Sequence, residues 1–242
     1  MQAVILAGGL GTRLHSVIGD LPKPLAPVQG RPFLEYQVKM LTASGFTRLV
    51  LCVGYRNELI QAHFGDGTAF GAQIIYSIEH QALGTAGALR QAQSHLDDTF
   101  LVLNGDTYFS ADLSLLVKSH TAAQALATIA LVRTLNAGRY GHVSLDADGY
   151  IAHFNEKGNS DPGFINAGVY IFSSAALRNL SDQIPLSLET QAFPELARQK
   201  LLRGCVLKGY FVDIGTPESY AQFQEDVALG RLCGRKESGI KP

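Results

Sequence analysis

The sequence lacks an excess of charge of either sign, and it contains few cysteines. Its 20 Lys and Arg residues face 21 Asp and Glu residues, for a formal net charge of -1. The charge balance therefore favours neither nucleic acid nor an anionic membrane surface as a partner. The three cysteines, Cys52, Cys205 and Cys233, lie far apart and match no zinc-binding spacing. We expect reduced thiols rather than a disulfide framework.

The chain also lacks a long apolar run. No stretch reaches the roughly 18 residues that a membrane-spanning helix requires. The N-terminal sequence MQAVILAGGLGTRL has no basic residue before its apolar segment, which is not typical of a signal peptide. We therefore expect a cytoplasmic protein with no membrane partner.

The composition is that of a globular domain. Hydrophobic residues make up 46% of the 242 residues and charged residues 17%, which is the reverse of the balance in a disordered chain. A chain of this length buries about 70% of the surface that its unfolded form exposes, so it needs no cross-links to fold.

Apolar segments alternate with helical patterns through the first half of the chain. Four segments are apolar on both faces, as in the buried strands of a parallel sheet: residues 3–8, 48–55, 73–79 and 99–106. Helices are expected over residues 32–44, 85–95 and 112–120, the first with Pro at its start and Gly just past its end. This alternation predicts an open α/β sheet with right-handed crossovers.

The second half has a different pattern, with several consecutive strands. Strands are expected over 127–133, 164–173 and 204–215, together with a hairpin over 140–156 whose turn is Asp146–Gly149. A helical pattern follows around 189–202, and Thr216 and Pro217 are the expected N-cap and first residue of the last helix. No linker divides the chain, so we expect one domain over 1–229 and a flexible tail over 230–242.

A glycine-rich loop follows the first predicted strand. It reads Gly8-Gly9-Leu10-Gly11-Thr12-Arg13, and glycines at such a place let backbone N–H groups approach phosphates closely. The spacing fits neither a P-loop nor the dinucleotide fingerprint, because Leu14 stands where that fingerprint needs its third glycine. From the glycines alone, a structural turn remains the alternative interpretation.

A second basic residue lies close in sequence. Lys23 stands between Pro22 and Pro24, and two prolines hold it on a stiff, extended segment. Together with Arg13 it forms a pair of cations suited to a triphosphate and to the charge that develops during its reaction. A turn residue is the alternative interpretation of Lys23.

These two segments carry a family resemblance. LAGGLGTRL followed by LPKPLAPV resembles the signature of the sugar-1-phosphate nucleotidyltransferases. Further motifs follow in the family's order over residues 1–229: Gly84–Gly87, Leu103–Asp106, Asn155–Lys157, Ile165–Gly168 and Val212–Gly215. The resemblance implies a Rossmann-like open mixed sheet flanked by helices. Many members of the family continue into a C-terminal β-helix, and here we expect a single domain without one. It also implies a nucleotide half over about 1–126 and a sugar-phosphate half over about 127–229.

The resemblance implies a reaction as well. A sugar 1-phosphate and a nucleoside triphosphate give a nucleotide-sugar and pyrophosphate, with Mg²⁺ as cofactor. The stretch DLPKPLAPVQGRPFLEY is most similar to the bacterial heptose 1-phosphate guanylyltransferases of surface glycan synthesis. It predicts GTP as donor and D-glycero-α-D-manno-heptose 1-phosphate as acceptor, and it leaves the oligomeric state open.

Other functions remain open at this point. Within the family, the alternatives are a mannose-1-phosphate guanylyltransferase and a uridylyltransferase acting on an amino-sugar 1-phosphate. Outside the family, a non-catalytic nucleotide-sugar sensor is disfavoured. Such a protein has no need to keep together the four charged residues Arg13, Lys23, Asp106 and Asp213. A dinucleotide-dependent oxidoreductase is disfavoured by the missing third glycine.

The expected site residues come from several motifs. Arg13, Lys23 and Asp106 are the expected catalytic residues. The expected nucleotide contacts are Leu6, Ala7, Gly8, Gly9, Gly11, Thr12, Arg13, Lys23, Glu79, Gly84 and Thr85. Glu79 is a candidate acceptor for the N1–H and N2–H₂ groups of guanine. The expected sugar-phosphate contacts are Gly141, Glu156, Lys157 and Asn166.

Two aspartates are the expected Mg²⁺ ligands. Asp106 and Asp213 each end an apolar strand, and open α/β sheets bind their ligands at the carboxyl ends of strands. The resemblance places both at metal positions of the family. Turn or capping roles remain the alternatives for each residue taken alone.

Overall fold

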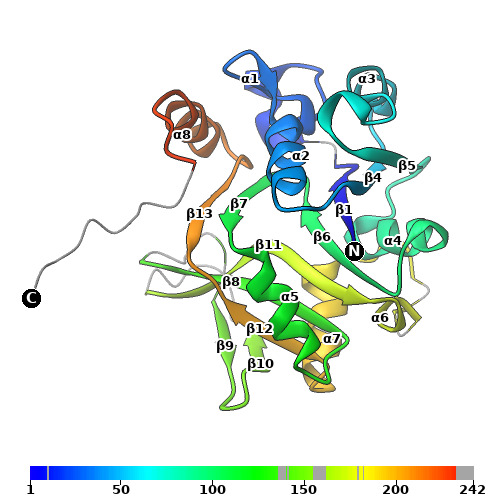
Figure 1. Ribbon diagram of the computed structural model, residues 1–242, viewed down its shortest axis with the longest axis vertical. Helices are drawn as coiled ribbons and strands as arrows, with labels where there is room; N and C mark the ends of the chain where they lie inside the picture. The colour runs from blue at the N-terminus through cyan, green and yellow to red at the C-terminus, as the bar shows by residue number, and fades with distance from the viewer. Residues whose placement is uncertain are drawn as a thin grey trace, which may run out of the picture.

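The fold is a mixed β-sheet with helices on both faces (Figure 1). The computed structural model describes residues 1–9, 11–135, 140, 142–154, 162–178, 180–181 and 183–232. Among these residues the main sheet has nine strands, seven of them in the order β10-β9-β11-β6-β1-β4-β5, with β8 pairing to β11 and β12 pairing to β8. The predicted open α/β sheet is confirmed.

The first half of the chain supplies the parallel part of this sheet. β1 (Gln2–Ala7) lies between β4 (Arg48–Val53) and β6 (Thr99–Asn104), and β5 (Gln73–Ile78) follows β4 at the edge. All three pairings are parallel, so the carboxyl ends of these strands meet at one edge of the sheet. All four predicted strands form, and β1, β4 and β6 are buried as predicted. The prediction that 73–79 is buried on both faces is wrong, because β5 is the edge strand and leaves Ile75 exposed.

The second half continues the sheet beyond β6 with antiparallel strands. β11 (Gly163–Ser173) pairs antiparallel with both β6 and β8 (Ala127–Thr134). β9 (Val143–Leu145) and β10 (Ile151–Phe154) form the predicted hairpin, and the Gly149 N–H donates to the Asp146 carbonyl in its turn.

The prediction of a single strand over 204–215 is wrong. The segment forms β12 (Leu202–Val206), which pairs parallel with β8, and then β13 (Gly209–Asp213), which pairs antiparallel with β7 (Thr107–Ala111) in a separate two-stranded sheet. At the break, the Leu207 N–H still donates to the Leu131 carbonyl. Because the apolar pattern runs through both strands, only the Lys208-Gly209 step marks the change of sheet.

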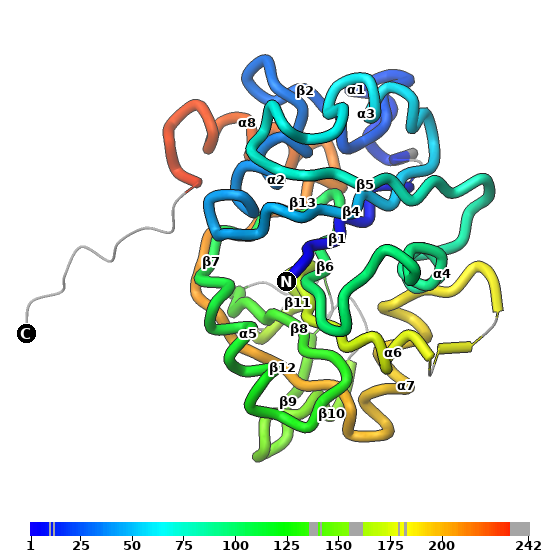
Figure 2. Tube along the Cα trace, turned by 45° about the vertical axis from the view of Figure 1, so that its right-hand side comes forward, coloured from blue at the N-terminus to red at the C-terminus, as the bar shows by residue number. Residues whose placement is uncertain are grey.

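Two groups of helices cover the two faces of the main sheet. α2 (Phe33–Ala43), α3 (Asn57–Phe64) and α5 (Leu113–Thr121) bury their apolar sides in one core. α4 (Gly84–Gln91), α6 (Ser174–Arg178) and α7 (Phe193–Arg198) pack into the other. Figure 2 shows α4, α6 and α7 together on one side of the strands, with α5 on the other.

The remaining helices, strands and turns complete the described chain. They are α1 (His15–Ile18), α8 (Pro217–Ala228), β2 (Pro27–Val28), β3 (Arg31–Pro32), the 3₁₀ turns Thr12–Leu14, Lys23–Leu25, Thr68–Phe70 and Ala92–His95, and the π-helical turn Leu188–Ala192. Thr216 caps α8 through the Ser219 N–H, with Pro217 in the first turn, as predicted. Within the described part of the chain, no helix combines the length and apolar character needed to span a bilayer.

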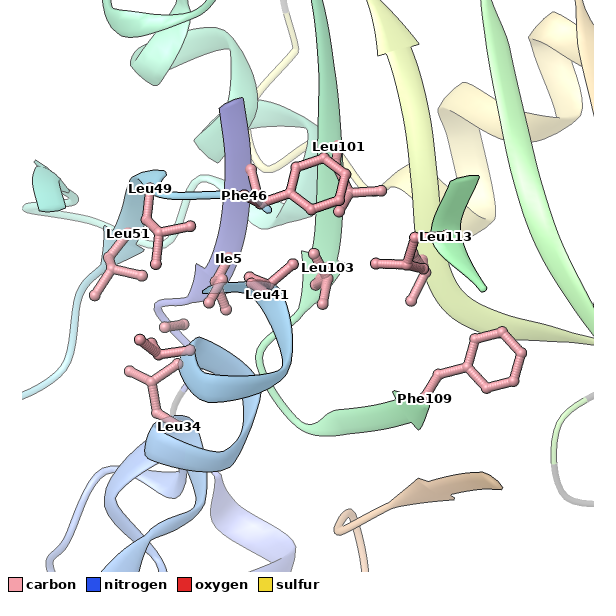
Figure 3. Close-up of a cluster of buried hydrophobic side chains, with 14 of the residues drawn as sticks. Ile5, Leu34, Leu41, Phe46, Leu49, Leu51, Leu101, Leu103, Phe109 and Leu113 are labelled. Atoms are coloured by element: carbon pink, nitrogen blue, oxygen red, sulfur yellow. The ribbon is translucent and has the colours of Figure 1, made fainter. Parts of the chain in front are cut away.

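The core beneath α2 holds the centre of the sheet together. Leu34 and Leu41 of α2 lie against Ile5 of β1 and Leu103 of β6 (Figure 3). All four side chains are fully buried, and each buried aliphatic side chain of this size stabilises the fold by about 1.5–3 kcal/mol relative to leaving it exposed. This packing fixes β1 beside β6.

Truncation of this core tests the packing directly. We expect Leu103→Ala to lower the free energy of unfolding by about 2–5 kcal/mol, because it leaves a cavity between α2 and β6. Leu115→Ala on α5 is the control, since that side chain is 48% exposed. Urea denaturation of both variants measures the difference, and similar losses in the two would contradict the core described here.

Candidate active site

A cavity of about 320 Å³ lies at the carboxyl ends of β1 and β6. Most of its described lining residues belong to the predicted site: Leu6, Ala7, Gly9, Gly11, Arg13, Lys23, Thr85 and Asp106. The others are Pro24, Asn104, Gly105, Glu189 and Gly215. The motifs therefore converge on one cavity, although they come from distant parts of the sequence.

An ion pair lies at the centre of the cavity wall. The Lys23 Nζ donates to Asp106 Oδ2 at 2.6 Å, and Thr107 Oγ1 lies 3.3 Å from Asp106 Oδ1. Only 9% of Lys23 is exposed, and a buried ammonium is stable only when it is paired and hydrogen-bonded. Lys23 is thus a buried group of the cavity and not a solvated residue. The expected extended segment ends at Pro22, because Lys23 begins the 3₁₀ turn Lys23–Leu25.

The glycine loop packs against this lysine. Gly11 has φ +64°, and a Cβ at this position would lie 3.0 Å from the Lys23 Cβ, so both the backbone conformation and the close approach favour glycine. The Leu14 N–H donates to the Gly11 carbonyl and closes the turn. Arg13 lines the same cavity and forms no ion pair with any residue that the structure describes.

The two predicted metal ligands lie on adjoining segments. In the β7–β13 pairing, Asp213 lies opposite Thr107, and the Ile214 N–H donates to the Asp106 carbonyl at 2.8 Å. Asp213 Oδ1 accepts a hydrogen bond from the Gly215 N–H, and Gly215 lines the cavity. The separate sheet formed by β13 therefore brings the end of the last motif to the end of β6.

The chemistry of this donor set fits Mg²⁺ in one binding mode. The described residues contain no group of three His, Cys, Asp or Glu side chains that could hold a metal ion. Mg²⁺, however, is usually held by one or two carboxylates together with substrate phosphates and water. Asp106 lines the cavity, whereas Asp213 lies on the adjoining segment and is not among the described lining residues. One carboxylate in the cavity and a second next to it suit that mode.

Glu79 lies beside the glycine loop but is not among the described residues that line the cavity. A Cβ at Gly8 would lie 2.5 Å from Glu79 Oε1, and the Leu83 N–H donates to Oε2 at 3.4 Å. Burial raises the pKa of this carboxyl above its ordinary value, partly opposed by the hydrogen bond from Leu83. Its contact with a nucleotide base stays a prediction.

The Gly84-Thr85 motif has a structural role as well. Gly84 has φ +74°, and a Cβ there would overlap the Leu186 carbonyl oxygen. The Ala86 N–H donates to the same carbonyl at 2.9 Å, and Thr85 Oγ1 accepts from the Leu188 N–H at 2.7 Å. Thr85 lines the cavity, whereas Gly84 makes room for the segment that docks on it.

The predicted sugar-phosphate residues are only partly described. Gly141, Glu156, Lys157 and the side chain of Thr12 lie outside the described part of the chain. Asn166 donates from Nδ2 to the Tyr170 hydroxyl at 3.0 Å and accepts from the Gly168 N–H at 2.8 Å. The β8–β11 register shifts between Asn166 and Tyr170, so Asn166 lies at an irregularity of the strand.

Five lining residues were absent from the predicted set, for two different reasons. Asn104, Gly105 and Gly215 belong to the motifs themselves, and Pro24 follows Lys23, so their positions could have been found. Glu189 gives no such signal, because an acidic residue in the first turn of a helix is ordinary and stabilising there.

The raised pKa of Glu79 predicts a pH-dependent effect on stability. Burial disfavours its ionised form in the folded chain, so this group lowers folding stability as the pH rises through its unfolded and then its folded pKa. Below the unfolded pKa the carboxyl is protonated in both states and the effect vanishes. We therefore expect Glu79→Gln to gain stability relative to wild type as the pH rises above the ordinary Glu pKa of about 4.3.

Urea denaturation at a series of pH values measures this gain. Glu225→Gln, on the exposed side of α8, corrects for the loss of one negative charge from the molecule. A difference between Glu79→Gln and wild type that stays constant with pH would show that burial does not penalise the Glu79 carboxylate.

Comparisons with known proteins agree with this geometry. The family model described as nucleotidyl transferase matches residues 2–229. A D-glycero-alpha-D-manno-heptose 1-phosphate guanylyltransferase of Campylobacter jejuni is 38% identical over 223 residues, which cover 92% of this chain and 98% of that protein. A mannose-1-phosphate guanylyltransferase of Mycobacterium tuberculosis is 36% identical over 238 residues, which cover 95% of this chain and 65% of that protein.

A solved structure has the same fold. The crystal structure of HddC from Yersinia pseudotuberculosis complexed with GMP-PN superposes with a TM-score of 0.82 at 33% sequence identity, covering 93% of this chain and 99% of that one. The family match extends over nearly the whole described chain and includes every residue of the cavity wall. The chain therefore belongs to the nucleotidyl transferase family.

Proposed function

We propose that this chain transfers GMP from GTP to D-glycero-α-D-manno-heptose 1-phosphate and releases pyrophosphate. The observation that carries the proposal is the convergence of the glycine loop, Arg13, Lys23 and Asp106 on one cavity at the carboxyl edge of the sheet. The names of the Campylobacter relative and of the GMP-PN complex support the guanine nucleotide and, for the first, the heptose acceptor.

The reaction itself needs no nucleophilic side chain. An oxygen of the sugar phosphate attacks the α-phosphorus of the triphosphate, the new P–O bond forms, and the bond from the α-phosphorus to the bridging oxygen of pyrophosphate breaks. Because the nucleophile is already an anion, the main obstacle is repulsion between two negatively charged substrates. Positioning and positive charge therefore supply most of the catalysis.

The cavity provides both positioning groups and positive charge. The backbone N–H groups of the glycine loop suit the phosphate chain, and the Arg13 guanidinium is planar and able to bind phosphate oxygens in pairs. Lys23 is held by its pairing with Asp106 at the place where the leaving charge would develop. On phosphate binding, its ammonium would exchange the carboxylate for a phosphate oxygen.

The residues that would hold Mg²⁺ are Asp106 and Asp213. The bound ion would neutralise phosphate charge and orient the triphosphate. Within this proposal, residues 1–126 bind the nucleotide and residues 127–229 bind the sugar phosphate. Glu156 and Lys157 of the second part, which lie outside the described residues, are the proposed contacts for sugar hydroxyls and the sugar phosphate.

Mannose 1-phosphate is the second acceptor to consider, because the Mycobacterium relative is named for it. Heptose differs from mannose by an added hydroxymethyl unit at C6, and a pocket with room for the larger sugar rejects the smaller one only weakly. Some activity on mannose 1-phosphate is therefore expected.

A pyrophosphate-release screen tests the proposal. GTP, UTP, dTTP, ATP and CTP are each paired with heptose, mannose and amino-sugar 1-phosphates in the presence of Mg²⁺. We expect GTP with the heptose 1-phosphate to give the highest kcat/KM. A preference for UTP or dTTP would overturn the guanylyl assignment, and faster turnover of mannose 1-phosphate would overturn the heptose assignment.

Removing one carboxylate tests the role of Asp106. Asp106→Asn keeps the size of the side chain but loses its charge, so we expect turnover to fall by about 10²–10⁴-fold. Asp98→Asn is the control, because Asp98 is exposed and does not line the cavity. Steady-state kinetics with circular dichroism as a check of folding measures the effect, and near-normal turnover in folded Asp106→Asn would remove this residue from the site.

A further inference from the structure

Glu189 brings a second carboxylate into the cavity wall, and the proposed reaction gives it no role. It belongs to the π-helical turn Leu188–Ala192 that precedes α7. Its Oε1 accepts a hydrogen bond from Asn104 Nδ2 at 3.4 Å, and its Oε2 accepts one from Ser187 Oγ at 3.4 Å. Both hydrogen bonds are long, so the carboxylate retains capacity to accept further donors.

The backbone before Glu189 is fixed to the other wall of the cavity. The Leu186 N–H donates to the Leu83 carbonyl at 2.8 Å, and the Ala86 N–H returns a hydrogen bond to the Leu186 carbonyl at 2.9 Å. The Leu188 N–H then donates to Thr85 Oγ1 at 2.7 Å. Glu189 is the next residue, so its side chain enters the cavity from a segment whose position is already set.

The charges of the cavity restrict what this carboxylate can bind. Asp106 is paired with Lys23, whereas no Lys, Arg or His of the described chain forms an ion pair with Glu189. An unpaired carboxylate repels phosphate groups in a partly desolvated site. Since an ionised carboxylate only accepts hydrogen bonds, the substrate groups that suit it are hydroxyls.

The position of Glu189 favours the acceptor over the ribose. Its partner Asn104 ends β6, and β6 pairs with β1 on one side and with β11 on the other. The glycine loop follows β1, and Glu79 lies beyond it, on the side of β4 and β5. Asn104 thus lies on the β11 side of the phosphate-binding loop, away from β4 and β5, and Glu189 lies between Asn104 and the Leu83–Thr85 segment on which its own segment docks.

A buried polar group continues this side of the site. Tyr170 of β11 is fully buried, and its hydroxyl accepts from Asn166 Nδ2 at 3.0 Å. Burial, together with the negative charge of Glu189, raises the pKa of the Tyr170 phenol well above its ordinary value, whereas the amides of Asn166 and Asn104 oppose the shift. The Glu189–Asn104 pair at the end of β6 and the Asn166–Tyr170 pair on the neighbouring strand β11 therefore give this side of the site two polar pairs on adjacent strands.

We propose that Glu189 accepts a hydrogen bond from a ring hydroxyl of the acceptor sugar and selects acceptors that carry a hydroxyl at that position. This assignment rests on the proposed function only in requiring a sugar 1-phosphate acceptor, and it does not depend on which sugar or which base is used. Asn104 orients the carboxylate, and the docked segment Leu186–Leu188 holds it in place.

Steady-state kinetics of two variants give the first test. We expect Glu189→Ala to raise the KM of the acceptor roughly tenfold or more, as for loss of a hydrogen bond to a charged group, while the KM of the nucleotide changes by less than about twofold. Glu189→Gln keeps the shape and loses the charge, so it should lie between wild type and Glu189→Ala. Glu225→Ala, on the exposed side of α8, is the control and should change neither KM.

A set of singly deoxygenated acceptors gives the decisive test. Wild type should lose about tenfold or more in kcat/KM with one deoxy sugar 1-phosphate, and Glu189→Ala should show no such loss with the same compound, because the partner of that hydroxyl is already gone. Calorimetric binding of the same compounds gives the same comparison without turnover. Equal losses in the two proteins for every deoxy compound would overturn the proposal.

Other outcomes are equally decisive. An increase in the nucleotide KM with an unchanged acceptor KM would assign Glu189 to the ribose and overturn the proposal. If Glu189→Ala fails to fold, the comparison is made with Glu189→Gln. The acceptor used in these tests is the sugar 1-phosphate that wild type prefers in the pyrophosphate-release screen. A preferred sugar other than the heptose would contradict the proposed function, but the test of Glu189 could still be made with that sugar.

Discussion

The ion pair between Lys23 and Asp106 joins two segments that lie 83 residues apart in the sequence. Its 2.6 Å length requires that the loop after β1 and the end of β6 lie side by side, which the parallel pairing of these strands provides. It also requires the close approach of Gly11 to Lys23 and a stiff segment on both sides of the lysine. A buried ammonium without a partner strongly destabilises the folded protein. The ion pair therefore stabilises the folded cavity before any substrate binds.

The remaining walls of the cavity depend on two connections made by the second half of the chain. β13 pairs with β7 and brings Asp213 and Gly215 beside Asp106. The segment before α7 docks on the Leu83–Gly87 turn and brings Glu189 beside Asn104. The site is therefore assembled from both halves of the sequence, and a sheet that carried only the parallel strands would present the loop without Asp213, Gly215 and Glu189.

The sequence predicts the fold well where local pattern and burial agree. The parallel strands are apolar on both faces, and α2 and α8 begin at prolines, so their positions follow from short segments alone. It predicts poorly where the outcome depends on distant partners. The division of 204–215 into β12 and β13 depends on whether β8 or β7 is the neighbour, and the apolar pattern suits both. The position of Glu189 also depends on distant partners. It lines the cavity only because the backbone of Leu186 and Leu188 docks on the start of α4.

A crystal structure of the chain with Mg²⁺, the sugar 1-phosphate and a GTP analogue that resists cleavage at the α-phosphorus tests the central claim most directly. We expect the triphosphate over Gly9 and Gly11, with Arg13 bound to it. We also expect the Lys23 ammonium to have moved from Asp106 to a phosphate oxygen, leaving the carboxylate for the metal ion. A triphosphate bound elsewhere, with Lys23 still paired to Asp106, would contradict it.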